Sequence, residues 1–389
     1  MTELSKDDLP LAGVRVVEFC AVAAGPFCGM LLADMGADVI KVEPPSGDAL
    51  RTWPPINNGF SENFASVNRN KRSFVLDLKQ HEDVLIAQRL CAQADIVIEN
   101  NRPGVMDRLG LGYESLSKGN ASLVYCSISA YGQIGPRSKE GGFDLTIQAA
   151  AGVMSVTGES EAPVKCGVPV ADFASGLYGA FAVVSALAKA KQSGVGMHLD
   201  VPMFGCSLAI GALQTSEYFG TGRSPGKLGS AHPRNAPYQA YRAADGHFAI
   251  AAGNDGLWRA VASAVGELQL TQDARFLTPT LRAQNQVALK EILESHFVEK
   301  PVDFWIETFK AAGVPHSRIN TYEEALADPQ VEAMGWVRDI ALPGGRLTRT
   351  FASPIRINGR SLPVYGAPPA LGADSEALRG IYAVSSGST

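Results

Sequence analysis

The chain has 389 residues, of which 46% are hydrophobic, and a formal net charge of −5. Because acidic and basic residues are interspersed, this composition indicates a globular protein and disfavours a nucleic-acid surface or a polybasic membrane anchor. The first residues, MTELSKDDLP, are charged and lack the apolar stretch of a signal peptide, so we expect a cytoplasmic location. The six scattered cysteines form no CxxC pair, which predicts reduced core residues and no metal site.

The N-terminal segment predicts a β-α-β unit. Strands are expected at Gly13–Phe19 and Ala37–Glu43, and Pro26 suits the first turn of a helix between them. This order implies parallel strands joined by a right-handed crossover. The intervening loop, AVAAGP, lacks the GxGxxG glycines, so NAD binding is disfavoured although Glu43 stands where a ribose ligand would.

A compact basic cluster follows a proline-rich loop. Arg69, Lys71 and Arg72 lie in the segment NRNKRS, which leads into a strand predicted at Phe74–Lys79. Two interpretations are open for this cluster. It is either a solvated turn or, together with Lys79, a loop that holds phosphates through charge-assisted hydrogen bonds.

Two further buried strands are predicted, at Asp95–Glu99 and Ser122–Ser129. Ligands bind at the carboxyl ends of strands in open parallel sheets, so Asn100, Arg102 and Arg108 are ligand candidates. The repetition of strand, loop and helix predicts a doubly wound α/β domain.

One carboxylate, Asp172, immediately precedes the longest uncharged apolar run of the chain, Phe173–Ala188. The run predicts a buried helix whose small residues allow close backbone approach, and it is slightly short for a membrane span of about 20 residues. Asp172 is therefore either the N-cap of this helix or a nucleophile or base held at its N-terminus. Its position alone does not decide between these roles.

The composition changes after Phe204, and a flexible glycine-rich connector is expected from Gly220. A smaller α+β domain is predicted at 223–315, with a hairpin at Gln239–Ala252, and residues 316–389 are expected to return to the large domain that spans 1–222. Gly253–Gly256 is either a mobile lid or a plain turn.

These motifs, taken in chain order, resemble those of the family III CoA-transferases, the group that includes formyl-CoA transferase, the carnitine CoA-transferases and the α-methylacyl-CoA racemases. The resemblance covers nearly the whole chain. The matching segments include AGPFCGMLLADMGADVIKVEPPSGDALR, NRNKRSFVLDLK, ADIVIENNRPG, GFDLTIQAAAG and GVPVADFASGLYGA. The resemblance implies the doubly wound fold and a homodimer whose two chains interlock.

The resemblance also implies that Asp172 is a nucleophile that transfers CoA from an acyl-CoA to a carboxylic acid. In the family mechanism, the carboxylate attacks the thioester to give a mixed anhydride, and the thiolate returns to give an aspartyl-CoA thioester. CoA is then a substrate, and no tightly bound cofactor is expected. Arg72 is a phosphate candidate on charge grounds alone. The family's CoA contacts, carried over residue by residue, fall on Ala24, Leu76, Lys79, Asn100, Arg102 and Arg108.

Three activities are weighed. Formyl-CoA transferase has a Gln where this chain has Ala23 and a basic residue where it has Pro44, which puts formate or oxalate specificity in doubt. Racemases of the same fold carry a proton-transferring His where this chain has Phe143, so transfer is favoured over racemisation. A non-catalytic CoA-binding protein is the third alternative, and the intact Asp172 argues against it.

The segments SVNRNKRS, HPRNAPYQAY and GND resemble the branch that moves CoA between dicarboxylates, such as succinyl-CoA with glutarate-, itaconate-, mesaconate- or oxalate-like acceptors. A second carboxylate on the acceptor requires a cationic partner. The candidates for this partner are Arg51, Lys227, Arg234 and Arg318.

Overall fold

The computed structural model describes residues 3–159 and 161–383. The chain forms two compact units: a large unit (Met1–Val153, Lys165–Arg223 and Pro329–Thr389) and a smaller unit (Met154–Val164 and Ser224–Asp328). The chain returns to the large unit at Pro329 and not at residue 316 as predicted. The reason is that strand β11 (His316–Arg318) extends the sheet of the smaller unit.

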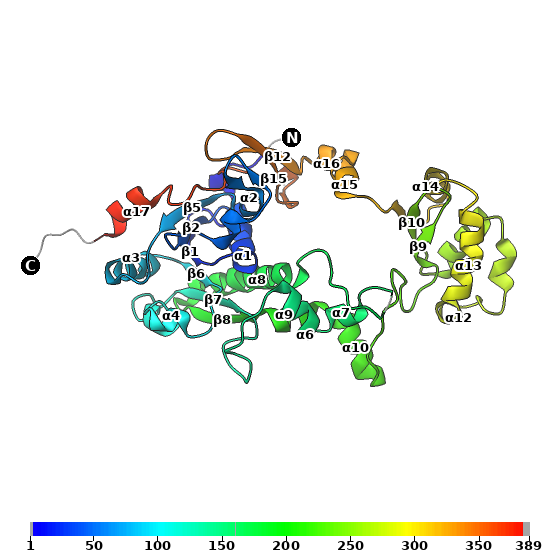
Figure 1. The fold of residues 1–389 in the computed structure, drawn as a ribbon, viewed down its shortest axis with the longest axis horizontal. Helices are drawn as coiled ribbons and strands as arrows, with labels where there is room; N and C mark the ends of the chain where they lie inside the picture. Colours follow the sequence, from blue (N-terminus) through cyan, green and yellow to red (C-terminus); the bar gives the residue numbers. More distant parts are fainter. Residues whose placement is uncertain (1–2, 160, 384–389) are drawn as a thin grey trace, which may run out of the picture. The chain divides into compact units, whose positions relative to one another are not determined.

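The large unit is built on one parallel six-stranded sheet. Its order is β5-β2-β1-β6-β7-β8, which can be followed strand by strand in Figure 1. This order runs outward in both directions from β1 and β6, which is the doubly wound arrangement expected from the repeated strand, loop and helix pattern. The strands are β1 (Arg15–Phe19), β2 (Asp38–Glu43), β5 (Lys71–Val75), β6 (Ile96–Glu99), β7 (Val124–Ser129) and β8 (Met197–Pro202).

Helices cover both faces of this sheet because successive strand residues point to opposite sides. Val16 belongs to one buried apolar cluster and Val17 to the other. The first face is covered by α1 (Ala24–Asp34), α6 (Asp144–Ala150), α8 (Val170–Ser193) and α9 (Met203–Ile210). The second face is covered by α3 (His81–Ala92), α4 (Val105–Arg108), α5 (Tyr113–Leu116) and α17 (Ser375–Tyr382).

The remaining elements of the large unit are short. They are η1 (Lys6–Asp8), η2 (Ala49–Thr52), α2 (Glu62–Asn68), α10 (Ala212–Thr221), α16 (Pro329–Met334) and the two-stranded pairs β3 (Ile56–Asn57) with β4 (Phe60–Ser61), β12 (Val337–Ala341) with β13 (Leu347–Phe351), and β14 (Arg356–Ile357) with β15 (Arg360–Ser361). Helix α7 (Val153–Val156) spans the chain boundary between the units.

Helix α8 is longer than the predicted run Phe173–Ala188. It has 24 residues and is, within the described residues, the one helix long and apolar enough to cross a membrane by length and composition. Half of its most apolar window is buried, as in the core helix of a folded domain. A Cβ on Gly176 would lie 2.8 Å from the carbonyl oxygen of Ala24, so the glycine allows α8 to approach α1 closely. Phe181, on the opposite side, is 70% exposed, so the prediction of a fully buried helix is wrong for that face.

The smaller unit packs helices on a three-stranded antiparallel sheet, and its core is rich in aromatic rings. The predicted hairpin is confirmed as β9 (Tyr238–Arg242) and β10 (His247–Ala251). Asn254 caps the next helix by accepting a hydrogen bond from the Leu257 N–H, so Gly253–Gly256 has the geometry of a turn, and a lid there stays a prediction. The helices are α11 (Asp255–Ala264), η3 (Leu268–Gln272), α12 (Pro279–Gln284), α13 (Gln286–Phe297), α14 (Val302–Ala311) and α15 (Tyr322–Leu326).

Candidate active site

A cavity of about 460 Å³ lies at the carboxyl end of the sheet in the large unit. Its walls come from the segments that follow β1, β6 and β7 and from the first turn of α8. Strands β1 and β6 are neighbours whose connections run in opposite directions, and doubly wound sheets bind ligands at such a switch point. The fold alone therefore places the candidate site here.

Asp172 lines this cavity as the third residue of α8. The N-cap of α8 is Pro169, so the interpretation of Asp172 as an N-cap is wrong. The helix start is instead satisfied by Asp144 of α6, whose Oδ1 accepts a hydrogen bond from the Ala171 N–H at 3.0 Å. Among the described residues, no donor forms a hydrogen bond or ion pair with the Asp172 carboxylate. This carboxylate is therefore available to a ligand.

Burial raises the pKa of Asp172 to about 6, and the negative charge of the neighbouring Asp144 adds to the effect. The carboxylate is ionised at pH 7 but is a stronger base than an ordinary aspartate. Titratable groups that are buried, close to a second charge and exposed to a cavity are typical of functional sites. Asp172 thus has the chemistry of a nucleophile or base and not of a structural cap.

Val22 of the loop between β1 and α1, and Ala24 at the start of α1, also line the cavity. The Asn100 side chain forms two hydrogen bonds with the backbone of this loop. Its Nδ2 donates to the Ala21 carbonyl at 2.9 Å, and its Oδ1 accepts from the Ala21 N–H at 3.0 Å. The N-cap of α1, Ala23, has no side-chain cap, and its first turn has no acidic residue. The positive end of the α1 dipole is therefore left for an anion at the cavity wall.

A buried charge network lies beneath the same loop. Glu18 pairs with Lys41 at 3.1 Å and with Lys71 at 2.8 Å, and Lys41 also pairs with Asp48 at 2.9 Å. All four side chains are at most 1% exposed. Two members of the network also hold loop backbone: Lys41 donates to the Cys20 carbonyl, and the Asp48 carboxylate accepts from the Val22 N–H.

This network holds Val22 in an unusual conformation. Val22 has a φ of 67°, a left-handed value that is strained for a β-branched residue. Such strain persists where surrounding contacts over-determine the backbone, and it concentrates at functional sites. The buried charges therefore set the shape of the cavity wall.

Four of the predicted site residues come together at the cavity: Ala24, Asn100, Arg102 and Asp172. Among the described residues that line it, Arg102 is the one basic side chain, and its guanidinium lies over Gly141. The convergence of these residues from α1, the β6 loop and α8 agrees with the ligand candidates taken from the sequence. Their contacts to CoA stay predictions.

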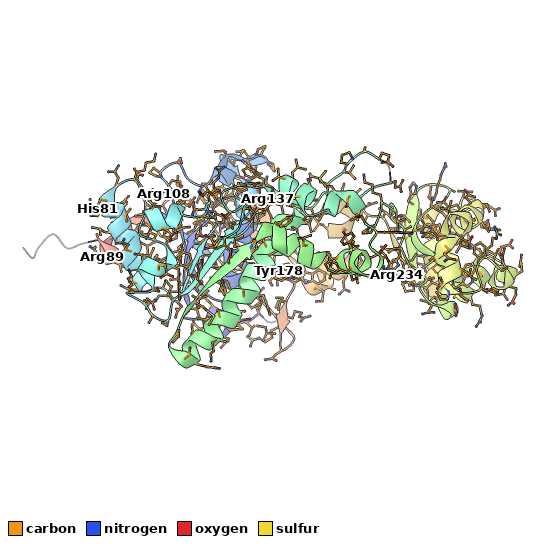
Figure 2. The ribbon with its side chains drawn as sticks, turned by 90° about the horizontal axis from the view of Figure 1, so that it is seen from below. His81, Arg89, Arg108, Arg137, Tyr178 and Arg234 are labelled. Atoms are coloured by element: carbon orange, nitrogen blue, oxygen red, sulfur yellow. The ribbon has the colours of Figure 1, made fainter. Side chains whose placement is uncertain are left out.

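The other four predicted contacts do not line this cavity. Lys79 and Arg108 are exposed on the surface, and Arg108 can be located in Figure 2. Leu76 is 1% exposed in the apolar core, so a contact to CoA would have to come from its main chain. Arg72 is half-buried and pairs with Asp374 at 3.3 Å and with Asp38 at 3.5 Å.

Both interpretations of the basic cluster are wrong for Arg69 and Lys71. Strand β5 begins at Lys71, earlier than the predicted Phe74, and places the Lys71 ammonium in the buried network. Arg69 is 3% exposed and forms a two-pronged pair with Asp34 at 3.0 and 2.5 Å. These residues are structural ion pairs and are neither solvated nor free for phosphate.

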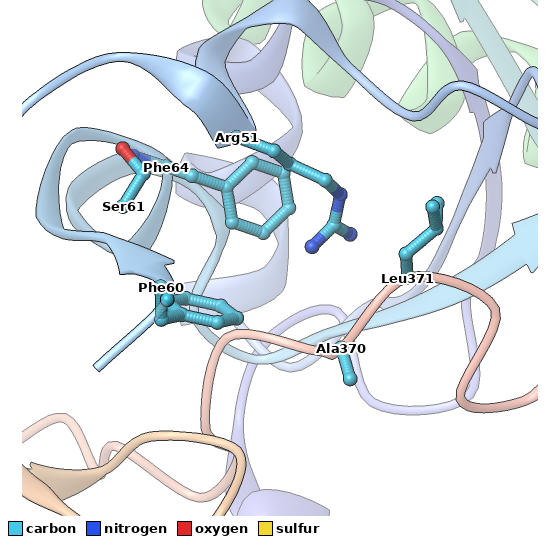
Figure 3. A pocket seen from close by; sticks show the side chains of 7 residues that line it. Arg51, Phe60, Ser61, Phe64, Ala370 and Leu371 are labelled. Carbon is cyan, nitrogen blue, oxygen red and sulfur yellow. The ribbon is translucent and has the colours of Figure 1, made fainter. Parts of the chain in front are cut away.

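Arg51 lines a separate, smaller cavity of about 180 Å³. Figure 3 shows its guanidinium beside the ring of Phe64, with Leu371 on the far side. Two of its nitrogens donate to the Glu43 carboxylate at 2.6 and 2.7 Å. This ion pair also occupies the carboxylate that the ribose of a dinucleotide would need. Arg51 is therefore held away from the Asp172 cavity, and the remaining candidates for the acceptor's second carboxylate, Lys227, Arg234 and Arg318, belong to the smaller unit.

Two residues at the site were not identified from the sequence. Asp144 and Gln148 lie one turn apart on α6 and reach the segment that precedes Asp172. The sequence feature that could have identified them is the motif GFDLTIQ, in which an acid and an amide are spaced four residues apart on one helix face. The cysteines agree with the sequence more closely: all six are free thiols, and Cys166 alone among them is not fully buried.

Comparison with known proteins agrees with this geometry. The sequence model of CoA-transferase family III matches residues 11–375. A succinate–glutarate CoA-transferase of Agrobacterium fabrum is 38% identical over 96% of this chain and 95% of its own length. A succinyl-CoA:mesaconate CoA-transferase of Haloarcula hispanica is 35% identical, over 89% of this chain and 90% of its own. The crystal structure of a CAIB/BAIF family protein from Brucella suis superposes with a TM-score of 0.85 at 39% identity, covering 96% of this chain and 99% of that one.

Proposed function

The chain belongs to CoA-transferase family III, and we propose that it moves CoA from succinyl-CoA to a short dicarboxylic acid through covalent intermediates on Asp172. The observation that carries the proposal is the Asp172 carboxylate, which lines the cavity without a hydrogen-bond partner among the described residues. It shares that cavity with Arg102 and with the uncapped start of α1 at Ala24.

The proposed reaction proceeds by alternating acyl transfers. The Asp172 carboxylate attacks the thioester carbonyl of succinyl-CoA, and the CoA thiolate leaves to give a mixed anhydride. The thiolate then attacks the aspartyl carbonyl, which releases succinate and gives an aspartyl-CoA thioester. The acceptor carboxylate repeats these two steps in reverse order, which yields the new acyl-CoA and regenerates Asp172.

Three features of the cavity support this chemistry. The raised pKa of Asp172, caused by burial and by Asp144, gives a more basic nucleophile that is still ionised at neutral pH. The N-terminus of α1 offers a positive dipole to the oxygen that becomes negative during each attack. The loop that carries Ala24 is fixed by Asn100 and by the buried charges, so these groups need not reorganise during the reaction.

The dicarboxylate preference is supported by the names of the two relatives, which act on glutarate and mesaconate. Arg102 supplies a cation at the cavity wall that suits a second carboxylate or a CoA phosphate. The test is a panel of acceptors with succinyl-CoA as donor, followed by separation of the CoA esters. Glutarate and mesaconate should accept CoA. A panel in which only monocarboxylates accept CoA would exclude the dicarboxylate preference.

Racemisation of a 2-methylacyl-CoA is the alternative for the same fold. It requires a proton donor and a proton acceptor on opposite faces of the α-carbon. Phe143, which is 72% exposed, lines the cavity where racemases of this fold carry a His, and no histidine is found among the described lining residues. Solvent deuterium entering a 2-methylacyl-CoA would support this alternative. CoA transfer to any acid would exclude a non-catalytic CoA-binding role.

We also propose that the protein is a homodimer, as family resemblance implies. The large unit carries an apolar groove of about 450 Å³ between α1 and the exposed face of α8, lined in part by Leu31, Leu177 and Phe181. An exposed apolar groove of this kind marks an interface, and a second copy of the chain is the proposed occupant. Phe181→Asp should shift sedimentation toward the monomer, and a monomeric wild-type protein would exclude the dimer. The cytoplasmic location stays a prediction.

A further inference from the structure

The segment that leads into Asp172 is irregular and is held at both ends by helix α6. Residues 154–164 belong to the smaller unit, and the chain re-enters the large unit at Lys165. From there to the start of α8 it forms no regular element except a tight turn, in which the Val170 N–H donates to the Val168 carbonyl at 2.7 Å. Without other contacts, such a segment would leave the position of Asp172 poorly defined.

Three hydrogen bonds supply these contacts. The Gln148 Oε1 accepts from the Cys166 N–H at 2.9 Å, and the Gln148 Nε2 donates to the Asp144 Oδ2 at 2.7 Å. The other oxygen of Asp144 accepts from the Ala171 N–H at 3.0 Å. The two ends of the segment are thus tied to one another through two side chains of α6.

The direction of each bond is fixed by chemistry. An ionised carboxylate only accepts, so the amide nitrogen of Gln148 must face Asp144 and its oxygen must face Cys166. Gln148 is 0% exposed, so a mismatched donor or acceptor there would be left without water. Neither side chain takes part in the hydrogen bond at the start of α6, where the Phe143 N–H donates to the Thr146 Oγ1 at 3.0 Å.

We propose that Asp144 and Gln148 are positioning residues that clamp residues 166–171 and so hold the Asp172 carboxylate in the cavity. This inference rests on the proposed role of Asp172 as nucleophile. It assigns the acid of the GFD motif a role in the transferase reaction that needs no contact with substrate.

The clamp can be broken and rebuilt by moving one charge. In Asp144→Asn, the new amide group faces the Gln148 amide, and one of the three hydrogen bonds is lost whichever way the side chains flip. In Gln148→Glu, two carboxylates meet at hydrogen-bond distance. In the double variant, the amide of residue 144 donates to the carboxylate of residue 148, which still accepts from Cys166, so all three bonds return.

The test measures kcat, KM for succinyl-CoA and thermal unfolding for both single variants and the double variant. Each single variant should lose about tenfold or more in kcat, the equivalent of one lost hydrogen bond, with KM changed less than about twofold. The double variant should recover to within about threefold of the wild type. Gln88→Glu is the matched control, because the Gln88 side chain also forms a hydrogen bond with backbone: its Nε2 donates to the Gly110 carbonyl at 3.2 Å, away from the cavity.

The outcomes separate the clamp from the proposed function. A wild-type protein without CoA exchange would exclude the function. An active wild type whose double variant is no better than the worse single variant, or whose single variants keep full kcat, would exclude the clamp alone. If a single variant does not fold, recovery of folding and activity in the double variant supports the clamp, and failure of the double variant to fold contradicts it.

Discussion

Two segments that position residues of the cavity, the loop after β1 and the segment before Asp172, are held in opposite ways. The loop after β1 rests on a buried network in which Glu18 and Asp48 are matched by Lys41 and Lys71. The segment before Asp172 is held by amide hydrogen bonds, and it brings two carboxylates, Asp172 and its neighbour Asp144, close enough that one raises the pKa of the other.

The charges beneath the first segment have a structural role, whereas the Asp172 charge after the second segment is available for reaction. In the first segment every charge is neutralised, so the charges can fix the backbone but cannot act on a substrate. In the second, the unmatched carboxylate costs folding free energy and is left reactive, as expected of functional sites. Removal of a charge from the buried network and removal of the Asp172 charge should therefore change stability in opposite directions.

The largest expected effect comes from breaking the neutralised network. Lys71→Met leaves the buried charges of Glu18 and its neighbours with an excess negative charge, and such a change costs about 3 to 5 kcal/mol of unfolding free energy. Denaturant titration measures it. The double variant Glu18→Gln with Lys71→Met keeps the Lys41–Asp48 pair and should be more stable than Lys71→Met alone. An equal or lower stability would show that the network is not balanced by charge.

Removing the reactive charge should have the opposite sign. The pKa of Asp172 is raised from 3.8 to about 6 in the folded protein, so ionisation destabilises the fold as pH rises through this range. Asp172→Asn should therefore raise the unfolding free energy at pH 7 by roughly 1 to 2 kcal/mol, after discounting for partial exposure. The gain should disappear near pH 4, where the wild-type carboxyl is also neutral in the folded state. A variant that is destabilised at pH 7 would contradict this account.

The pKa of Asp172 also determines the pH at which activity is lost on acidification, which is the acid limb of the pH–rate profile. Because the proposed nucleophile is the ionised form and this pKa belongs to the protein without substrate, kcat/KM for succinyl-CoA should fall as pH drops through about 6. In Asp144→Asn, one of the two causes of the raised pKa is removed, so the limb should move to lower pH. A pH–rate profile for each protein measures this. A limb that stays in place would show that Asp144 acts on Asp172 only by positioning it through the hydrogen bonds with Ala171 and Gln148.

The smallest effect is expected for the exposed cations. Lys79 has no side-chain partner among the described residues, so Lys79→Ala should change the unfolding free energy by less than about 0.5 kcal/mol. If Lys79 contacts a CoA phosphate, KM for succinyl-CoA should rise about two- to fivefold, and less at high salt. An unchanged KM at low salt would remove Lys79 from the predicted contacts.

The sequence predicted the parts of this molecule that local pattern determines. The β-α-β periodicity predicted the parallel sheet, and the position of Asn100 after β6 predicted its place at the cavity, because strand ends in such sheets meet at one edge. The partners of charged residues could not be predicted. Lys71 and Glu18 are 53 residues apart, and Asp144 and Ala171 are 27 apart, so only the folded chain brings each pair together.

For the same reason, the start of α8 was misjudged from the sequence. An Asp before an apolar run is typical of an N-cap, and only the contact with Asp144 shows that the cap comes from another helix.

The central claim is that Asp172 carries the acyl group and then CoA. The most direct test incubates the protein with succinyl-CoA, traps with hydroxylamine, and examines the peptides by mass spectrometry, with Asp172→Ala as the control. We predict a hydroxamate on the peptide that contains Asp172, absent from the variant, together with a loss of CoA exchange in the variant of at least about a thousandfold. An unmodified Asp172 peptide, with exchange persisting in the variant, would contradict the account.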